Sequence, residues 1–374
     1  MRRELESVEI PGEHDARERT WPVVESAFAG RQPVPRPSHW PRVAAIAVAL
    51  VALVAAALSP PGRAVIDEVR EAVGVERAQP ALFSLPAQGR LLVASDAGVW
   101  IVQEDGSKRL LGDYREASWS PFGRFVVAAR ENELAALDPD GDVRWTLARP
   151  GVRFPQWTGT ETDTRVAYVD RTGIRVVAGD STDDRLLVRG ARGPIAWRPG
   201  AGFVLAYATT REVLVRDLDS RRILWRADRP GGRSRIRALE WSSDGELLVV
   251  LQPFALRVYD TRGQVTSQDD PSDAARDADA AVRPGTRDVS VIRLHGSQST
   301  LFRLATGKPL FSGTGTFDQV TWSPDGRWIL VTWPTADQWV FVRADGKRVR
   351  AVSNVSEQFR TRSFPRLQGW CCLP

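Results

Sequence analysis

The chain has 374 residues, of which 43% are hydrophobic and 26% are charged, and its formal net charge is +5. This length and apolar content suffice for a folded core. The 51 basic and 46 acidic residues are interspersed, so the sequence shows no basic stripe and predicts no nucleic-acid partner. The excess of arginine over lysine is typical of a G+C-rich genome rather than of phosphate recognition.

Residues 43–58 contain no polar side chain, and the uncharged span between Arg42 and Arg63 has 20 residues. At a rise of about 1.5 Å per residue, such a span crosses the roughly 30 Å hydrocarbon core of a membrane. The sequence therefore predicts a transmembrane helix over residues 43–61. A buried core helix and a cleaved signal peptide are the alternatives, although a core helix is rarely apolar on every face.

The charges beside this helix predict its orientation. Arg31, Arg36 and Arg42 precede it without a nearby acid, whereas basic and acidic residues are mixed after residue 62. Because positive flanks stay in the cytoplasm, we expect residues 1–42 to form a short cytoplasmic tail and residues 81–374 to be extracytoplasmic. Residues 62–80 place apolar residues on one helical stripe, which predicts a juxtamembrane stalk helix.

Five tryptophans recur at intervals of about 40 residues, with one interval about twice as long. They are Trp119, Trp157, Trp197, Trp241 and Trp322. Turn-forming residues follow most of them, as in Trp241-Ser-Ser-Asp-Gly245, and then come runs of β-branched or apolar residues, as in Leu247-Leu-Val-Val-Leu251. About four such runs in each period are typical of one blade of a β-propeller.

The repeat therefore predicts an all-β fold, a β-propeller of four-stranded blades, over residues 81–374. Counting from the tryptophan register favours seven blades, with boundaries near residues 113, 151, 191, 231, 271 and 314. Six or eight blades are the alternatives, because the first and sixth units are weak. The C-terminal segment 363–370 repeats the start of a unit, so we expect it to complete the first blade and close the ring.

The hairpin Trp322-Ser-Pro-Asp-Gly-Arg327 resembles the WD40-like repeats of TolB-type propellers, and the resemblance covers roughly residues 81–370. It implies the propeller fold but says little about function. Two segments that end at Trp145 and Trp225 also resemble the outer-strand motif of quinoprotein-type propellers.

The two cysteines, Cys371 and Cys372, are adjacent. They allow a vicinal disulfide, a bond between chains or a pair of buried thiols. Vicinal disulfides occur in the quinoprotein dehydrogenases, so the second resemblance favours the first of these.

No group of residues predicts catalysis, a cofactor or a metal site. His295 is the one histidine after the predicted membrane helix, and no metal-binding or nucleophile spacing is present. The acidic segment Asp138-Pro-Asp-Gly-Asp142 is typical of a hairpin turn and lacks the final glutamate of an EF-hand loop.

The polar stretch 264–287 is the strongest candidate for interaction. Because binding residues concentrate on loops held by a rigid scaffold, we expect it to be an exposed loop that contacts a partner or a cation. Its candidate residues are Asp269, Asp270, Asp273, Asp277 and Asp279. Trp333, Trp339 and Arg211 are candidate interface anchors, with packing between blades as the alternative.

These features favour a membrane-anchored, extracytoplasmic propeller that binds a protein, peptide or envelope ligand without catalysis. A quinoprotein-like oxidoreductase or a propeller hydrolase is the enzymatic alternative. A third hypothesis is a transmembrane sensor, in which ligand binding changes the contacts of a short cytoplasmic helix over residues 20–30. The same segment is also compatible with a lightly ordered tail.

Overall fold

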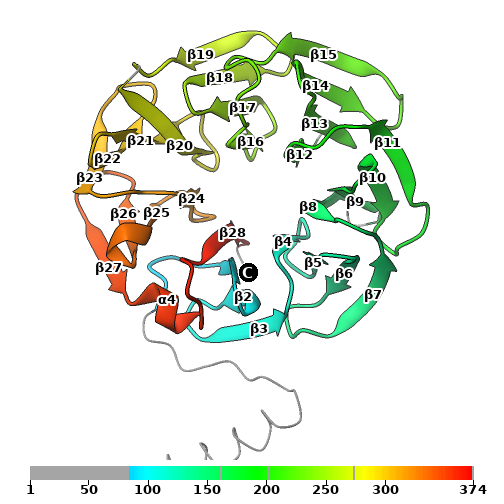
Figure 1. Ribbon diagram of the computed structural model, residues 1–374, viewed down its shortest axis with the longest axis horizontal. Coiled ribbons are helices and arrows are strands. Elements are labelled where there is room, and N and C mark those ends of the chain that lie inside the picture. The colour runs from blue at the N-terminus through cyan, green and yellow to red at the C-terminus, as the bar shows by residue number, and fades with distance from the viewer. Residues whose placement is uncertain (1–83, 161, 201, 273, 373–374) are drawn as a thin grey trace, which may run out of the picture. The chain divides into compact units, whose positions relative to one another are not determined.

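The computed structural model of the protein describes residues 84–160, 162–200, 202–272 and 274–372. These residues form seven four-stranded antiparallel sheets arranged in a ring (Figure 1). The propeller fold and the count of seven blades predicted from the tryptophan repeat are confirmed. In each blade we letter the strands a to d from the centre of the ring outward.

Six blades are continuous in sequence, with the predicted boundaries between them. Blade 2 comprises β4 (Glu116–Trp119), β5 (Val126–Arg130), β6 (Glu133–Leu137) and β7 (Val143–Ala148). Blade 3 comprises β8 (Arg153–Gly159), β9 (Thr164–Val169), β10 (Gly173–Ala178) and β11 (Arg185–Arg189). Blade 4 comprises β12 (Ile195–Trp197), β13 (Val204–Ala208), β14 (Glu212–Asp217) and β15 (Ile223–Asp228).

The remaining continuous blades follow in chain order. Blade 5 comprises β16 (Ala238–Trp241), β17 (Leu247–Gln252), β18 (Ala255–Asp260) and β19 (Val265–Asp269). Blade 6 comprises β20 (Ala275–Val282), β21 (Val289–His295), β22 (Gln298–Arg303) and β23 (Pro309–Thr314). Blade 7 comprises β24 (Val320–Trp322), β25 (Trp328–Trp333), β26 (Gln338–Arg343) and β27 (Val349–Ser353). Two short helices, η1 (Pro334–Ala336) and α4 (Val355–Gln358), lie after β25 and β27.

Blade 1 joins the two ends of the ring. Its strands b to d are β1 (Arg90–Ser95), β2 (Gly98–Val102) and β3 (Lys108–Gly112), and its strand a is β28 (Arg366–Cys371). In the register, Leu91 lies opposite Trp370 and Arg90 opposite Cys371. The expected closure by the C-terminal segment is therefore observed, and it pairs the edge that β1 would otherwise expose.

The repeated turn after the motif tryptophan is held by its own side chains. The Ser323 hydroxyl accepts a hydrogen bond from the Trp328 backbone N–H at 2.9 Å and donates one to Asp325 at 2.6 Å. The Asp325 carboxylate in turn accepts from the backbone N–H of Arg327 at 3.0 Å. Gly326 has a φ of +64°, a value that glycine adopts without strain. The Ser-x-Asp-Gly sequence thus closes the hairpin between strands a and b.

The core is divided among the seven contacts between neighbouring blades. Each of the seven clusters of buried apolar residues combines side chains from two adjacent blades. Trp241, for example, is 5% exposed and packs with Ala196 and Val204 of the preceding blade. The tryptophan repeat therefore marks the layer at which blades meet, and burial of this layer stabilises the ring.

Two predictions need comment. Residues 264–287 are not one long loop, because β19 and β20 occupy most of the stretch. The pattern was misleading because β19 is an exposed outer strand and therefore polar. The predicted tail (1–42), transmembrane helix (43–61) and stalk helix (62–80) lie outside the described residues. Within the described ranges, no helix has the length and hydropathy needed to span a membrane.

Candidate binding face

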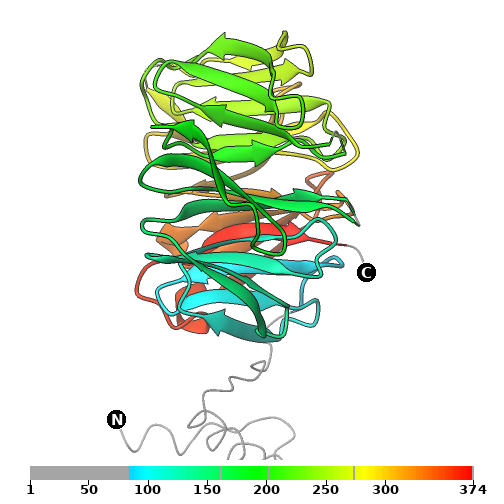
Figure 2. The same ribbon diagram turned by 90° about the vertical axis from the view of Figure 1, so that its right-hand side faces the viewer.

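The ring has two loop faces on opposite sides, which Figure 2 shows edge-on. One face, here called the d–a face, carries the connections between blades and the loops between strands b and c. The other, here called the a–b face, carries the a–b and c–d hairpins. Arg211 lies in the β13–β14 loop, and Trp333 ends β25, so both belong to the d–a face. Asp269 and Asp270, at the end of β19, lie on the same face.

Three of the five acidic candidates are paired with arginines. Asp270 accepts a hydrogen bond from Arg257 at 2.9 Å. Arg293 bridges two of the others, with its guanidinium 2.6 Å from Asp269 and 2.8 Å from Asp277. Asp273 lies outside the described residues. The pairing shows that these carboxylates serve the blade itself rather than forming an open acidic patch.

Asp277 illustrates this structural role. Its side chain is 0% exposed, and burial raises its pKa although Arg293 lowers it in part. Asp279, two residues later on the same strand, accepts a hydrogen bond from the backbone N–H of Val320 in the next blade at 2.9 Å. Both side chains therefore stabilise the packing of blade 6.

The two tryptophan candidates differ in exposure. Trp339 is 0% exposed and packs against Phe359, with ring centroids 5.1 Å apart. Trp339 thus packs between blades, which is the alternative stated for it, because consecutive residues of β26 are buried on both faces of the strand. Trp333 is half-buried against Phe317 at 5.2 Å, whereas Arg211 is exposed. Arg211 is therefore the most accessible of the predicted anchors.

A pocket of about 630 Å³ opens on the d–a face across blades 3, 4 and 5. Six arginines line it: Arg153, Arg189, Arg192, Arg229, Arg233 and Arg235. Its apolar lining comes from Phe154, Ala191, Pro194, Ala208 and Ile236. Among the described residues no carboxylate lines it. The pocket therefore combines an apolar surface with a strong local excess of positive charge.

Carbonyl groups, not carboxylates, hold the central arginine of this pocket. Arg229 donates to the Thr209 carbonyl at 3.0 Å and to the Ser234 carbonyl. Burial lowers its pKa. Because carbonyl oxygens carry no net charge, the guanidinium keeps its attraction for an incoming anion.

Gln252 orders the arginine-rich loop that follows β15. The Gln252 side chain is 0% exposed and comes from β17. Its carbonyl accepts a hydrogen bond from the Gly231 backbone N–H at 2.8 Å, and its amide donates to the Ser234 carbonyl at 2.6 Å. The loop that carries Arg229, Arg233 and Arg235 is therefore tied to the rigid blade.

Two carboxyl groups on inner strands have raised pKa values. Burial among the surrounding strands raises the pKa of Glu240 to about 8, and the nearby charge of Asp279 adds to the effect. Burial likewise raises the pKa of Asp279 to about 7. Glu240 is nevertheless accessible to water, so its carboxyl lies in solvent enclosed by inner strands rather than in a dry core. Within the part of the chain that is described, no cluster of three or more metal-ligating side chains occurs.

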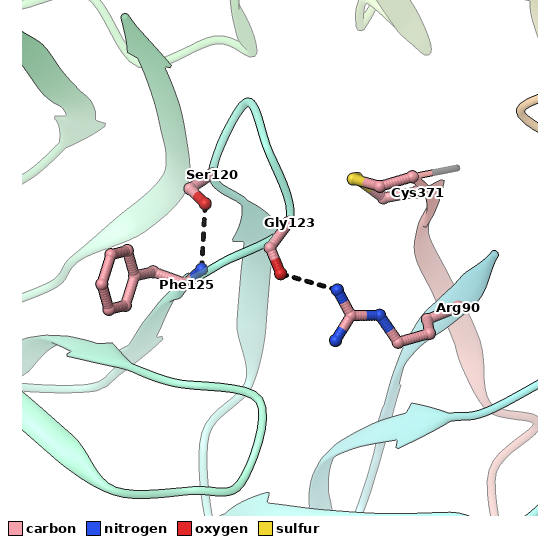
Figure 3. The surroundings of a disulfide bond; sticks show 6 residues. Arg90, Ser120, Gly123, Phe125 and Cys371 are labelled. Atoms are coloured by element: carbon pink, nitrogen blue, oxygen red, sulfur yellow. Dashed lines mark hydrogen bonds between the residues drawn. A yellow bond between two sulfur atoms is a disulfide. The ribbon is translucent and has the colours of Figure 1, made fainter. Parts of the chain in front are cut away.

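The cysteine pair lies at the end of β28, on the a–b face. The structure joins Cys371 to Cys372 in a disulfide. Beside it, Arg90 donates a hydrogen bond to the Gly123 carbonyl of blade 2 at 2.7 Å (Figure 3). A Cβ atom at Gly123 would lie 2.7 Å from the sulfur of Cys372. The pair therefore packs directly against the turn of the next blade, where the ring closes.

Sequence reasoning missed the arginine pocket and Glu240. The segment Arg229-Pro-Gly-Gly-Arg-Ser-Arg235 was visible as a basic run, but its partner segment, Arg189-Gly-Ala-Arg192, lies about 40 residues earlier. The propeller brings these two segments together as equivalent d–a connections. An ionisable residue directly before a motif tryptophan, as in Glu240-Trp241, was the signal for a charge on an inner strand.

No protein-family model matches the sequence, and no curated protein matches it either. Solved structures with a similar fold include the Cps50 (Swd1) β-propeller domain of Myceliophteria thermophila. That domain has a TM-score of 0.55 and 13% identity, and the match covers 71% of this chain and 99% of that one. The C-terminal WD40 domain of Sif2 has a TM-score of 0.52 and 13% identity, with 79% and 87% covered. The described chain thus has the fold of a seven-bladed WD40-type propeller.

Proposed function

We propose that this propeller is a non-catalytic binding module that holds an acidic segment of a partner protein or peptide on its d–a face. The observation that carries the proposal is the arginine-lined pocket across blades 3 to 5. We further propose that residues 43–61 anchor the chain in a membrane with the propeller outside the cytoplasm. That part rests on the apolar span and on the arginines that precede it.

The chemistry of the pocket favours a peptide over a purely ionic ligand. Arginine forks bind carboxylates in a bidentate manner, and arginine is enriched in protein interfaces. The apolar lining, which includes Phe154 and Ile236, offers a contact for an apolar side chain next to the acidic group. Arg211 extends the positive surface, since its carbonyl accepts a hydrogen bond from the Arg229 backbone N–H at 2.9 Å.

The pocket is also pre-organised, which favours binding. The Gln252 contacts hold the loop after β15 before any partner arrives. A loop that is already ordered loses less conformational entropy on association, so more of the contact energy contributes to affinity.

The test of the binding role is chemical cross-linking of the full-length protein in native membranes, followed by quantitative mass spectrometry of captured proteins. The variant Arg192→Glu/Arg233→Glu reverses two exposed charges that take part in no ion pair recorded within the described ranges. We expect it to reduce capture of the specific partner by about tenfold or more. The control is Arg171→Glu, an exposed charge on the same face but outside the pocket.

The comparison between the two variants decides the proposal. Equal capture by the pocket variant and the wild type would contradict it, as would an equal loss in the Arg171→Glu control. The topology is tested separately by adding protease to intact spheroplasts. We expect loss of the 81–374 region, and full protection of that region would place the propeller in the cytoplasm.

A further inference from the structure

A second positively charged pocket lies on the opposite, a–b face, between blades 6 and 7. Its volume is about 520 Å³. Six cationic side chains line it: Arg283, Arg303, Lys308, Arg327, Arg343 and Lys347. Asp345 is the one carboxylate in the same lining. Four hairpins contribute these residues, one a–b and one c–d hairpin from each blade.

The contact between blades 4 and 5 provides an internal reference for this site. There Arg198, which follows the motif tryptophan of blade 4, donates to the Gly245 carbonyl of the next blade at 2.6 Å. Its guanidinium also lies 5.5 Å from the Trp241 ring. Between blades 6 and 7, Arg283 occupies the equivalent position. It donates to the Gly326 carbonyl at 2.8 Å and lies 5.5 Å from the Trp322 ring.

The two contacts differ in one charge. Arg198 also pairs with Glu246, the residue after the turn glycine, at 3.2 Å. The residue after the turn glycine of blade 7 is Arg327 instead. The acid that pairs with Arg198 is thus absent here, as it is beside Arg90 at the contact between blades 1 and 2, where Arg124 follows the turn glycine. Arg283 has no ion pair among the described residues.

The first position of the c–d hairpin changes from acid to base between blades. The residue that opens the c–d hairpin is an aspartate in blades 2, 4 and 5, where Asp138, Asp217 and Asp260 donate their backbone N–H across the hairpin. In blades 6 and 7 the same backbone hydrogen bond is made by Arg303 and Arg343. Both of these arginines line the pocket.

Backbone carbonyls of blade 7 hold Arg283 and Arg303, and the cluster as a whole is incompletely neutralised. Arg303 donates to the Ala344 carbonyl of blade 7 and lies 3.3 Å from Asp288. The Arg303 atom in this ion pair is Nε, which is buried. Arg343 lies 3.7 Å from Asp345, and neither Lys308 nor Lys347 has an ion pair recorded within the described residues. Arg327 lies 3.9 Å from Asp325, and its side chain is 75% exposed. Six cations face the carboxylates Asp288, Asp325 and Asp345, so the cluster carries a net positive charge.

We propose that this pocket binds a phosphate-bearing ligand, with the guanidinium groups of blades 6 and 7 clamping the phosphate and the two lysines adding positive charge at the rim. A phosphate offers several charged acceptor oxygens, which match arginine forks and lysine ammonium groups. The volume lies within the range of small-molecule sites, so the ligand is larger than a bare inorganic ion.

The phosphate has two possible sources, a soluble phosphorylated compound and an anionic lipid headgroup. The described chain enters the ring on this same face, where Leu85 donates its backbone N–H to the Glu104 carbonyl at 2.9 Å. If a membrane anchor precedes this point, as proposed above, an anionic lipid is one candidate source of the phosphate. The phosphate chemistry of the site does not depend on that anchor, nor on the d–a face.

The experiment is isothermal titration calorimetry of the detergent-solubilised full-length protein at low ionic strength, where screening is weak. The probes are inorganic pyrophosphate, short-chain phosphatidylglycerol and short-chain phosphatidylcholine. We expect pyrophosphate to bind and Arg327→Glu to weaken that binding by about tenfold or more, because it replaces a cation of the pocket with the kind of carboxylate seen beside Arg198. Binding of phosphatidylglycerol, but not phosphatidylcholine, at the same site would identify a lipid source.

Arg124→Glu is the matched control. Arg124 is exposed and follows the turn glycine of blade 2, so the substitution makes the same charge change at the same hairpin position in another blade. We expect its effect on pyrophosphate affinity to stay within about twofold. An equal loss in both variants would mean that net charge alone governs binding. That result, or absence of pyrophosphate binding to the wild type, would overturn the proposal.

Discussion

Removal of Arg293 tests whether the acidic residues of blade 6 are structural. The Arg293→Ala change leaves the Asp277 carboxylate without its partner, and that side chain is 0% exposed. Losing one partner of a buried pair costs about 3–5 kcal/mol of unfolding free energy. The upper limit is set by protonation, because Asp277 can take up a proton instead. Protonating a carboxyl group with the ordinary pKa of 3.8 costs about 4 kcal/mol at pH 7 and about 1.6 kcal/mol at pH 5.

The sign of the pH effect follows from the raised pKa. Because folded Asp277 binds a proton more readily than the unfolded chain does, its contribution to stability falls as pH rises above 3.8. In the wild type, Arg293 offsets part of the stability that is lost when Asp277 ionises. The Arg293→Ala variant lacks this compensation. We therefore expect a loss of about 3 kcal/mol at pH 7, or roughly 6–9 °C in Tm, and a clearly smaller loss at pH 5.

The assay is thermal unfolding followed by near-UV circular dichroism at both pH values. Arg257→Ala is the control, since it breaks the pair with Asp270, whose side chain is 52% exposed, and should cost under about 1 kcal/mol. The double variant Asp277→Asn/Arg293→Ala should lose the pH dependence. Equal Tm values for Arg293→Ala and Arg257→Ala would show that the Arg293–Asp277 pair does not stabilise blade 6. An equal loss of stability at pH 5 and pH 7 would show the same.

Three further predictions concern ring closure, the inner carboxyl groups and the cysteines. Trp370→Ala removes an 8% exposed side chain from the closing strand and should cost about 3–5 kcal/mol, measured as a lower calorimetric Tm; a shift within error would contradict closure by β28. Glu240→Gln/Asp279→Asn should flatten the fall in stability between pH 5 and pH 8, because both folded pKa values are raised and both groups favour folding most at low pH; an unchanged slope in pH-dependent melting would refute this. Reduction of the Cys371–Cys372 disulfide should shift Tm by no more than about 2 °C, since a bond between neighbours hardly constrains the unfolded chain; a large drop on adding reductant would show otherwise.

The fold was predictable because its signal repeats. Each motif tryptophan packs between two blades, and each Asp-Gly turn must allow a positive φ, as at Gly245 and Gly326. These requirements recur in most of the periods, so the sequence signal is repeated along the chain. The blade count and the closing role of residues 363–370 followed from this repetition. Segment 264–287 was misread because an exposed outer strand has the composition of a loop.

The candidate sites were less predictable because they depend on neighbours that are distant in sequence. Asp277 is polar in the sequence, but Arg293 on the adjacent strand makes it part of the core. Trp339 is aromatic and near a loop, yet Phe359 from α4's end covers it. The arginine pocket of the d–a face needs two connections that are a full blade apart. The arginines are visible in the sequence, but only the fold shows that they line the same pocket.

Within a repeat protein, equivalent positions of different blades can be compared directly, and departures from the repeat acquire meaning when several converge in space. The backbone contact made by Arg198 is reproduced by Arg283, which shows that the arginine itself has a structural use. That use does not explain Arg327, because the turn closes equally well with Glu246 in blade 5. Nor does hairpin geometry require Arg303, since aspartate opens the same hairpin elsewhere.

Like charges around one cavity repel each other, and the hairpins gain no stability from them. The a–b hairpin position alone does not mark this site, because Arg124 occupies it in blade 2. What distinguishes blades 6 and 7 is that Arg303 and Arg343 replace the aspartates of the c–d hairpins and meet Arg327 in a single pocket of about 520 Å³. An anion that occupies the pocket would supply the missing negative charge, which is why the Arg327→Glu and Arg124→Glu pair separates a selected site from a generally basic surface.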